Sequence, residues 1–586
     1  KIKSNDSIRG SKFETINNQI NHIFTHYIDL TVLLDTIDKL KKCIKIIKKN
    51  YDGVMTYEKI DIINKLKNYS NSNELPVSIF LKLIVDCFYV RSFEIDEDVS
   101  KLTETAIVTI YKTKINTREL LKKIGIEIPS SRIIDETTIN LFPDQLEILK
   151  LKAPYLIAME TKDLSQITKN DIIPIEEKRI TIPKPNNEPV IGVIDTLFYE
   201  DVYFNEWVTY ESKIDPNIQT DSSDCEHGTA ITSLIVDGPT INPHLDDGCG
   251  RFRVKHFGVA TKGRFSSFTI LKMIREIVAG NTNIKVWNLS LGSVLEIHPN
   301  FISPEAAELD RIQCEYDVIF VIAGTNKPRG RETEMKLGAP ADSLNSIVVN
   351  SVTSDNKPCS YHRVGPVLSF FHKPDVSYYG GDKGDYIRVC TPYGEGFVSG
   401  TSFAAPWITR KVAYLIYNLR FSREVAKALI IDSAAGWDRH DDMSHSIGYG
   451  VVPIKIEDVV NCADDEIRFI LTGVSDKYET YTYNIPVPVV NDKHPYFARA
   501  TLCYFPRCSR NQGVDYTDTE LDIHFGRVMQ TPRGVQINCI NDNVQDNLNG
   551  VGIYEGPART LHRKWDNIKH ISDKIKEKRI QVYNFD

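Results

Sequence analysis

Between residues 188 and 455, strand-like apolar runs alternate with segments of helical periodicity, and this alternation restricts the fold more than any other feature of the sequence. Such alternation predicts a parallel sheet with helices packed on both of its faces. We therefore predict the α/β class for this region. The predicted strands are 190–194, 254–259, 284–289, 318–323 and 346–352, and the predicted helices lie near 268–279, 304–316 and 402–419.

The segments on either side of this region have different patterns. Residues 1–95 are predicted as a helical N-terminal region, because apolar residues recur at spacings of three and four in their first half. Within them, the run 77–90 fits either a buried helix or a strand. Residues 104–167 follow the order β-α-β-β-α-β, with one strand at 133–134, which predicts a small α+β module of the ferredoxin-like kind. Residues 456–586 alternate polar and apolar positions between turn residues, which predicts a β-sandwich-like domain.

Composition excludes several classes of protein. Hydrophobic residues make up 41% and charged residues 25%, which is ordinary for a globular chain and excludes a disordered tail or a collagenous fibre. The net charge is −7, and no basic stripe is wide enough for a nucleic-acid footprint. We interpret the most basic run, 39–49, as the solvent-exposed face of a helix rather than a phosphate- or lipid-binding patch. The sequence contains no run of 18 consecutive apolar residues, so no membrane-spanning segment is predicted.

Cysteine usage bears on the compartment. The 11 cysteines are scattered and odd in number, and only Cys503 and Cys508 lie close together. This pattern is typical of reduced thiols rather than of a secreted disulfide framework. A zinc site would need a second close pair or suitably spaced histidines, and the sequence has neither. We therefore predict a cytoplasmic protein without a metal site, although a sequence that begins with Lys1 leaves a removed signal peptide open.

A short motif near the end of the α/β region carries the strongest functional signal. Gly-Thr-Ser-Phe-Ala-Ala-Pro at 400–406 opens a long apolar helix, which places Ser402 at the helix N-terminus. There, unpaired backbone N–H groups and the positive end of the helix dipole stabilise a developing oxyanion. Gly400 permits the close approach of a substrate backbone. We interpret Ser402 as a candidate nucleophile, with an ordinary helix N-cap as the alternative.

Three other side chains are suitable partners for this serine. The strand 190–196 places Asp195 at its carboxyl end, where parallel sheets bind ligands. His227 precedes Gly-Thr at the start of a predicted helix, and Asn326 follows the buried strand 318–323, where its amide can donate to an oxyanion. Each has an ordinary explanation when taken alone: a turn aspartate, a chance histidine or a loop amide. Their combination with Ser402 predicts an acyl-transfer site.

Together these residues resemble the subtilisin-like serine peptidases (subtilases, the S8 family) over about residues 188–455. The order Asp195, His227, Ser402 is the order found in subtilisin. The resemblance implies that Ser402 is the nucleophile, that His227 transfers its proton, and that Asp195 orients the imidazole. It also implies an oxyanion hole formed by Asn326 and the backbone N–H of Ser402, with no metal needed for the chemistry. Structural calcium occurs in the family, but no calcium loop can be read here.

The resemblance extends to substrate binding and to the flanking module. Residues 288–292 (Asn-Leu-Ser-Leu-Gly) resemble the strand that pairs with substrate and lines the S1 pocket, which makes Ser290, Leu291 and Gly292 substrate-binding candidates. The module 104–167 resembles, in order and place, the propeptide that many subtilases carry before the catalytic domain.

Two positions depart from the family pattern. Leu197 stands where a glycine usually follows two residues after the catalytic aspartate, so the strand end is expected to bend differently. Thr325 intervenes in the usual Ala-Gly-Asn motif. Asn326 is the predicted oxyanion donor, and Thr325, with a weaker hydroxyl, is the alternative. The next cations, Lys327 and Arg329, are interpreted as a solvated loop rather than as selectors of an acidic substrate side chain.

The sequence as a whole predicts a cytoplasmic serine endopeptidase that acts on protein or peptide substrates and is regulated by its flanking domains or by a protein partner. Neither a nucleic acid nor a membrane is an expected partner. The alternative is a latent or pseudo-protease subunit of a larger defence or stress complex, acting mainly as a peptide-binding scaffold.

Overall fold

The structure is a computed structural model. It describes residues 8–16, 19–26, 28, 30–66, 75–90, 92–93, 105–162, 173–174, 181–261, 266–328, 330–368, 371–436, 443–464, 466–474, 476, 481, 483, 497–509, 516–517, 519, 521, 523, 526–532, 534–539 and 566–574. The chain divides into two compact units, Lys1–Ser11 with Ile23–Thr161, and Lys12–His22 with Lys162–Asp586.

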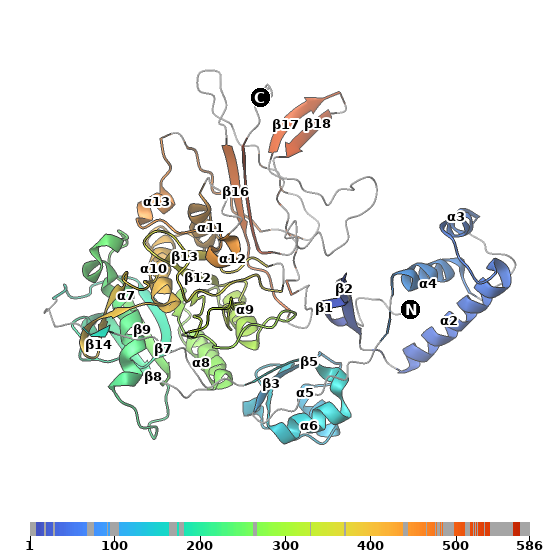
Figure 1. Ribbon diagram of the computed structural model, residues 1–586, viewed down its shortest axis with the longest axis horizontal. Helices are drawn as coiled ribbons and strands as arrows, with labels where there is room; N and C mark the ends of the chain where they lie inside the picture. The colour runs from blue at the N-terminus through green and yellow to red at the C-terminus, as the bar shows by residue number, and fades with distance from the viewer. Residues whose placement is uncertain are drawn as a thin grey trace. The chain divides into compact units, whose positions relative to one another are not determined.

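The second unit is built on a seven-stranded sheet in the order β13-β12-β11-β10-β7-β9-β8 (Figure 1). All six neighbouring pairs are parallel, which confirms the predicted α/β class. The five predicted strands are present, and the sheet adds β8 and β13 at its edges. β8 was missed because an edge strand with exposed polar residues lacks the apolar run of a buried strand. The strands are β7 (Val190–Thr196), β8 (Val208–Ser212), β9 (Arg253–Ala260), β10 (Val286–Leu289), β11 (Ile319–Ala323), β12 (Ile347–Val352) and β13 (Val376–Tyr379).

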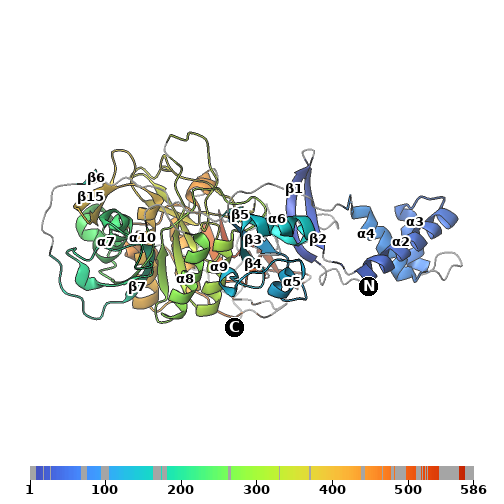
Figure 2. The ribbon, with the colours of Figure 1, turned by 90° about the horizontal axis from the view of Figure 1, so that it is seen from below.

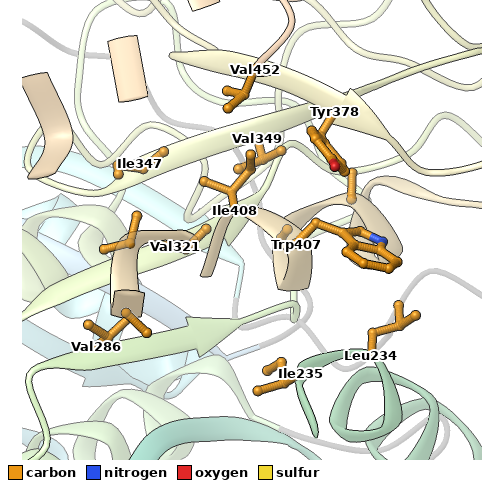
Figure 3. Packing of buried hydrophobic residues seen from close by; sticks show 14 of the residues in the cluster. Leu234, Ile235, Val286, Val321, Ile347, Val349, Tyr378, Trp407, Ile408 and Val452 are labelled. Atoms are coloured by element: carbon orange, nitrogen blue, oxygen red, sulfur yellow. The ribbon is translucent and has the colours of Figure 1, made fainter. Parts of the chain in front are cut away.

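Alternate residues of the central strands face two different cores. In β11, Ile319 and Val321 pack in a core that also holds residues of α7, α10 and α11, whereas Phe320 and Ile322 pack in a core with residues of α8 and α9. This division follows from the two-residue period of a strand. Figure 3 shows the first core, where Ile408 of α10 lies among Val321 and neighbouring strand residues. The helices are α7 (Glu226–Ile241), α8 (Ser267–Ala279), α9 (Pro304–Tyr316), α10 (Thr401–Ala413) and α11 (Arg423–Ala435).

The strand order places a crevice at the carboxyl ends of the central strands. From β7 the chain moves outward to β8, returns through β9, and then continues on the other side of β7 with β10 and β11. Ligands bind at such a reversal of strand order. Asp195 lies near the end of β7, Ser290 follows β10, and Asn326 follows β11, so three candidate residues are brought to this edge by topology alone.

A small three-stranded sheet, β14-β15-β6, lies in the same unit, and Figure 2 labels its strands β6 and β15. Its pairings are antiparallel, and β15 ends two residues before Gly400. The sheet and two short helices are β6 (Ile173–Pro174), β14 (Ile387–Thr391), β15 (Gly394–Val398), α12 (Ser444–Ile447) and α13 (Ile456–Val460).

The module predicted at 104–167 has three strands rather than four. Its sheet has the order β4-β3-β5, with β3 (Ala106–Ile110), α5 (Thr117–Lys123), β4 (Thr138–Leu141), α6 (Pro143–Lys152) and β5 (Ile157–Lys162). The strand predicted at 133–134 is reduced to an isolated bridge between Ile133 and Ile139. The Asp135 side chain accepts hydrogen bonds from the N–H groups of Thr137 and Thr138, and this turn reverses the chain before a strand can extend.

The N-terminal region is only partly helical, so the prediction for residues 1–95 was wrong at its start. Strands β1 (Ile8–Ile16) and β2 (Gln19–His26) form a two-stranded sheet, and helices α2 (Leu30–Tyr51), α3 (Tyr57–Leu66) and α4 (Val77–Tyr89) follow. The run 19–26 is short and rich in Ile, Phe and Thr, which favour strands, so its apolar spacing did not identify a helix. Among the described helices, none is both long and apolar enough to cross a membrane.

The described residues of 456–586 do not form the predicted sandwich. They contain two separate two-stranded antiparallel ribbons, β16 (Phe497–Cys503) with β19 (Ile568–Lys574), and β17 (Gly526–Thr531) with β18 (Gly534–Cys539). Part of this segment packs into the α/β core: Arg499 pairs with Asp432 of α11 at 3.0 Å, and the Tyr516 hydroxyl donates to Asp310 of α9 at 2.7 Å. Residues 478–487, which belong to the alternating pattern behind this prediction, lie mostly outside the described residues.

Candidate active site

Asp195 and His227 form a hydrogen-bonded pair at the end of β7 and the start of α7. His227 Nδ1 lies 2.6 Å from Asp195 Oδ1. The Asp195 carboxylate is fully buried, and the same oxygen also accepts from the backbone N–H of Thr196 at 2.7 Å. His227 Nε2 is buried and has no hydrogen-bond partner within the described part of the chain. The pair therefore has the orientation of a carboxylate that holds an imidazole, with the second ring nitrogen available for a proton.

The backbone around this pair is fixed by close packing. The Gly228 N–H donates to Thr196 Oγ1 at 2.8 Å. A Cβ atom on Gly228 would lie 2.5 Å from the Leu197 carbonyl oxygen, so only glycine fits directly after His227. Leu197, which departs from the family pattern, is buried, and its Cδ2 lies 2.8 Å from where a Cβ on Gly258 would be. A side chain at position 258 on the neighbouring strand β9 would therefore crowd Leu197.

A buried histidine beneath the pair was not found from the sequence. His256 of β9 is fully buried, and its Nε2 donates to the Thr196 carbonyl at 2.8 Å, while Nδ1 lies 2.8 Å from Thr232 Oγ1. Burial lowers the pKa of this imidazole, so the neutral ring is favoured. It ties β9 and α7 to the segment that carries Asp195. A lone histidine within an apolar strand was the only sequence signal for it.

Ser402 lies in the first turn of α10, as predicted, and is almost entirely buried. Its Oγ donates to the Ser290 carbonyl at 3.3 Å, and Ser290 Oγ donates to the Ser402 carbonyl at the same distance. Asn288 extends this polar contact, because its amide donates to Ser290 Oγ and its oxygen accepts from Thr409 of α10. In this arrangement Ser402 Oγ is bonded to the segment after β10 and not to His227.

Asn326 is oriented by the residue that precedes the nucleophile. Its Oδ1 accepts from the Thr401 N–H at 3.1 Å and from Thr401 Oγ1 at 2.9 Å. Thr325, the alternative donor, has its hydroxyl engaged elsewhere: it donates to the Gly324 carbonyl at 2.6 Å and accepts from the Gly338 N–H at 2.9 Å. The Thr325 hydroxyl is therefore engaged within its own loop, whereas the amide oxygen of Asn326 is held by Thr401.

One small cavity brings most of the candidates together. Ser402, Asn326, Ser290 and Gly292 all line it, and the other lining residues are Ala323, Thr325 and Thr401. Leu291 does not line this cavity and instead contributes to an adjoining apolar one. Lys327 is partly buried, and Arg329 lies outside the described residues. Among the described residues, no cluster of three or more His, Cys, Asp or Glu side chains is suited to hold a metal ion.

A parallel sheet, a histidine held by a buried carboxylate, and a serine at a helix N-terminus are features that serine peptidases share with other serine hydrolases. Residues 186–450 match the model described as the subtilase family, so this region is a subtilisin-like serine peptidase domain, and the chain has additional segments before and after it. None of the curated proteins compared with the chain matches it.

Several solved protease structures are similar to part of this chain, at low identity. The protease domain of PatA is 17% identical with a TM-score of 0.37, over 46% of this chain and 94% of that one. The epidermin leader peptide processing serine protease EpiP from Staphylococcus aureus is 16% identical with a TM-score of 0.42, over 62% and 100%. The prenylagaramide maturation protease PagA is 19% identical with a TM-score of 0.36, over 47% and 93%.

Proposed function

We propose that the chain is an endopeptidase that hydrolyses peptide bonds through Asp195, His227 and Ser402 and an acyl-enzyme intermediate. The observation that supports it most is the 2.6 Å contact between His227 Nδ1 and Asp195, in a site where the second imidazole nitrogen has no partner among the described residues. The His227 ring also lies 5.7 Å, between ring centroids, from Phe403, the residue after Ser402. A basic nitrogen without a partner, beside the segment that carries a helix-terminal serine, is what general-base activation of a hydroxyl needs.

The proposed reaction begins with a rotation of the serine side chain. Ser402 Oγ leaves the Ser290 carbonyl, turns to His227 Nε2 and attacks the substrate carbonyl carbon as its proton passes to Nε2. The rotation is inexpensive, because a neutral hydrogen bond contributes only about 1 kcal/mol. Asp195 stabilises the imidazolium, and Asn326 with the Ser402 N–H stabilises the oxyanion. His227 then protonates the leaving amine, and water, activated by the same imidazole, hydrolyses the acyl-enzyme.

The wider setting is proposed on separate grounds. All ten cysteines whose side chains the structure describes are free thiols, which favours a reducing compartment such as the cytoplasm. Protein or peptide substrates follow from the class of enzyme. Regulation by the flanking segments or by a protein partner, and chemistry without a metal, stay predictions from the sequence.

Fluorophosphonate labelling tests the proposed function. We expect one equivalent of a small alkyl fluorophosphonate to attach to the wild-type chain at Ser402, located by peptide mass spectrometry, and no label on Ser402→Ala. The variant His244→Ala, which alters an exposed histidine, is the control and should label like the wild type. A folded wild-type chain that takes no label would contradict the proposal and favour a latent subunit or a peptide-binding scaffold, and addition of cell lysate as an activator would then separate those two.

The oxyanion role of Asn326 gives a second prediction. Asn326→Leu keeps the side-chain volume but removes the amide, so kcat for a peptide substrate should fall by about 10²–10³-fold with little change in KM. Thr401→Val removes only one of the two bonds that orient the amide, and its loss should be smaller. A fall of less than about fivefold in Asn326→Leu would assign the oxyanion to other donors.

A further inference from the structure

Thr325 holds an unusual backbone conformation next to the proposed oxyanion donor. Its φ is +65°, in the left-handed region that β-branched residues avoid. Its side chain is almost fully buried, and its Oγ1 is bonded to both the Gly324 carbonyl and the Gly338 N–H. These two hydrogen bonds fix the rotamer, so the position of the Cγ2 methyl is fixed as well.

The methyl group of Thr325 fills space next to Gly292. A Cβ atom placed on Gly292 would lie 2.6 Å from Thr325 Cγ2, well inside van der Waals contact. Both residues line the cavity that also contains Ser402 and Asn326. The Thr325 methyl group therefore occupies the space between the segment after β11 and the segment after β10.

Little room is left between these residues. The cavity volume is about 10 Å³, which is close to what a single water molecule requires. Protein interiors resist the insertion of extra methylene groups, because these force neighbouring side chains and backbone to shift. The walls here are short or fixed, since Gly292, Ala323 and the hydrogen-bonded Thr325 have no flexible side chain that could move away.

The proposed chemistry places one part of the substrate at this cavity. If Ser402 attacks a carbonyl carbon whose oxygen points to Asn326, the α-carbon of the residue on the acyl side, P1, is one bond away. The part of the cavity beside Ser402 and Asn326 therefore takes the carbonyl oxygen, and the P1 side chain lies against the remaining wall, which includes Gly292 and Thr325. The adjoining apolar cavity is lined by neither Ser402 nor Asn326, so it is not an alternative for P1.

We propose that Thr325 closes the P1 site of this protease and restricts cleavage to peptide bonds that follow glycine, alanine or serine. The proposal rests on the proposed function and adds its substrate class. A larger P1 side chain would have to displace the Thr325 methyl group, and this would break the two hydrogen bonds that hold it.

Variants at 325 separate the methyl group from the hydroxyl. Thr325→Ser removes only Cγ2 and keeps both hydrogen bonds, and Thr325→Gly removes the whole side chain at a φ that suits glycine. Thr325→Val keeps the Cγ2 methyl group and replaces the hydroxyl with a second methyl group. We expect the first two to accept larger P1 residues and the third to keep the restriction.

The probes are peptidyl diphenylphosphonates that differ only at P1, with the side chain of alanine, leucine or phenylalanine. Ser402 Oγ forms a bond to phosphorus and expels one phenoxide, while the Oγ proton passes through His227 to the phenoxide. For the wild type we expect the alanine probe to react faster than the leucine probe by tenfold or more, since each added carbon in a closed pocket costs roughly 10- to 200-fold. Thr325→Ser should reduce this ratio, and Thr325→Gly should bring it near one or invert it.

The small alkyl fluorophosphonate, which has no P1 side chain, reports separately on Ser402. If it labels the wild type while the leucine or phenylalanine probe reacts as fast as the alanine probe, the restriction is overturned and the proposed function stands. An unchanged ratio in Thr325→Ser would also overturn it, even if Thr325→Gly failed to fold. If no probe reacts with the folded wild type, the proposed function fails and the restriction fails with it.

Discussion

His227→Ala and Ser402→Ala should each lower kcat for peptide hydrolysis by about 10⁶-fold, and the double variant should be no worse than either single one. The reason is that the two side chains act as a unit: without the imidazole the hydroxyl stays protonated, and without the hydroxyl the imidazole has nothing to activate. Residual catalysis would come from Asn326, the helix N-terminus and substrate binding alone. The measurement is kcat on one peptide that the wild type cleaves.

If the fold-loss of kcat in the double variant equalled the product of the two single fold-losses, His227 and Ser402 would act independently, and this prediction would be contradicted. His244→Ala is again the control, and its kcat should equal that of the wild type. Asp195→Asn should lose about 10⁴-fold, since it keeps a hydrogen-bonding side chain but no longer stabilises the imidazolium.

The catalytic region was predictable because its signals are local. The strands that form the centre of the sheet are continuous apolar runs, and His227 is directly followed by a glycine that close packing demands. The parallel sheet then brings Asp195, His227 and Ser402 to one edge, although they are far apart in the sequence. Asn326 was chosen for the same reason, as the first amide after a strand end, and its oxyanion role stays a prediction.

What the sequence did not predict depends on contacts between distant segments. His256 acts through Thr196, a residue on the neighbouring strand, and no local pattern marks it. The direction of Ser402 Oγ depends on the Ser290 carbonyl, and the packing of Tyr516 against Asp310 depends on a segment about two hundred positions away. At the N-terminus, 19–26 satisfied the helical and the strand pattern alike, so only pairing with a second strand decides its structure.

Of the substitutions proposed for this chain, one that breaks a buried ion pair outside the active site should lower the free energy of unfolding most. Arg410 of α10 and Asp247 are both fully buried, with contacts of 2.7 Å and 2.9 Å between them. Arg410 also donates to the carbonyls of Ile235 in α7 and Gly250, so the pair joins the helix that carries Ser402 to the helix that carries His227. Asp247→Asn keeps the shape but leaves the guanidinium charge unpaired, and we expect the free energy of unfolding to fall by about 3–5 kcal/mol, measured by urea denaturation.

The neighbouring residue offers a matched control for this prediction. Asp246 pairs with Lys455 at 2.7 Å, but both side chains are about half exposed, so Asp246→Asn should leave the denaturation midpoint close to that of the wild type.

The pH dependence of stability gives a second check. Burial alone would raise the pKa of Asp247, but the charge and hydrogen bonds of Arg410 outweigh it, and the net pKa is lowered. The stabilisation is therefore complete above the ordinary carboxyl pKa of about 4 and is lost as the pH falls through the lower folded value. The difference in the free energy of unfolding between the wild type and Asp247→Asn should become smaller only in that acid range. If this difference is already small at pH 7, the two helices are held together by apolar packing alone.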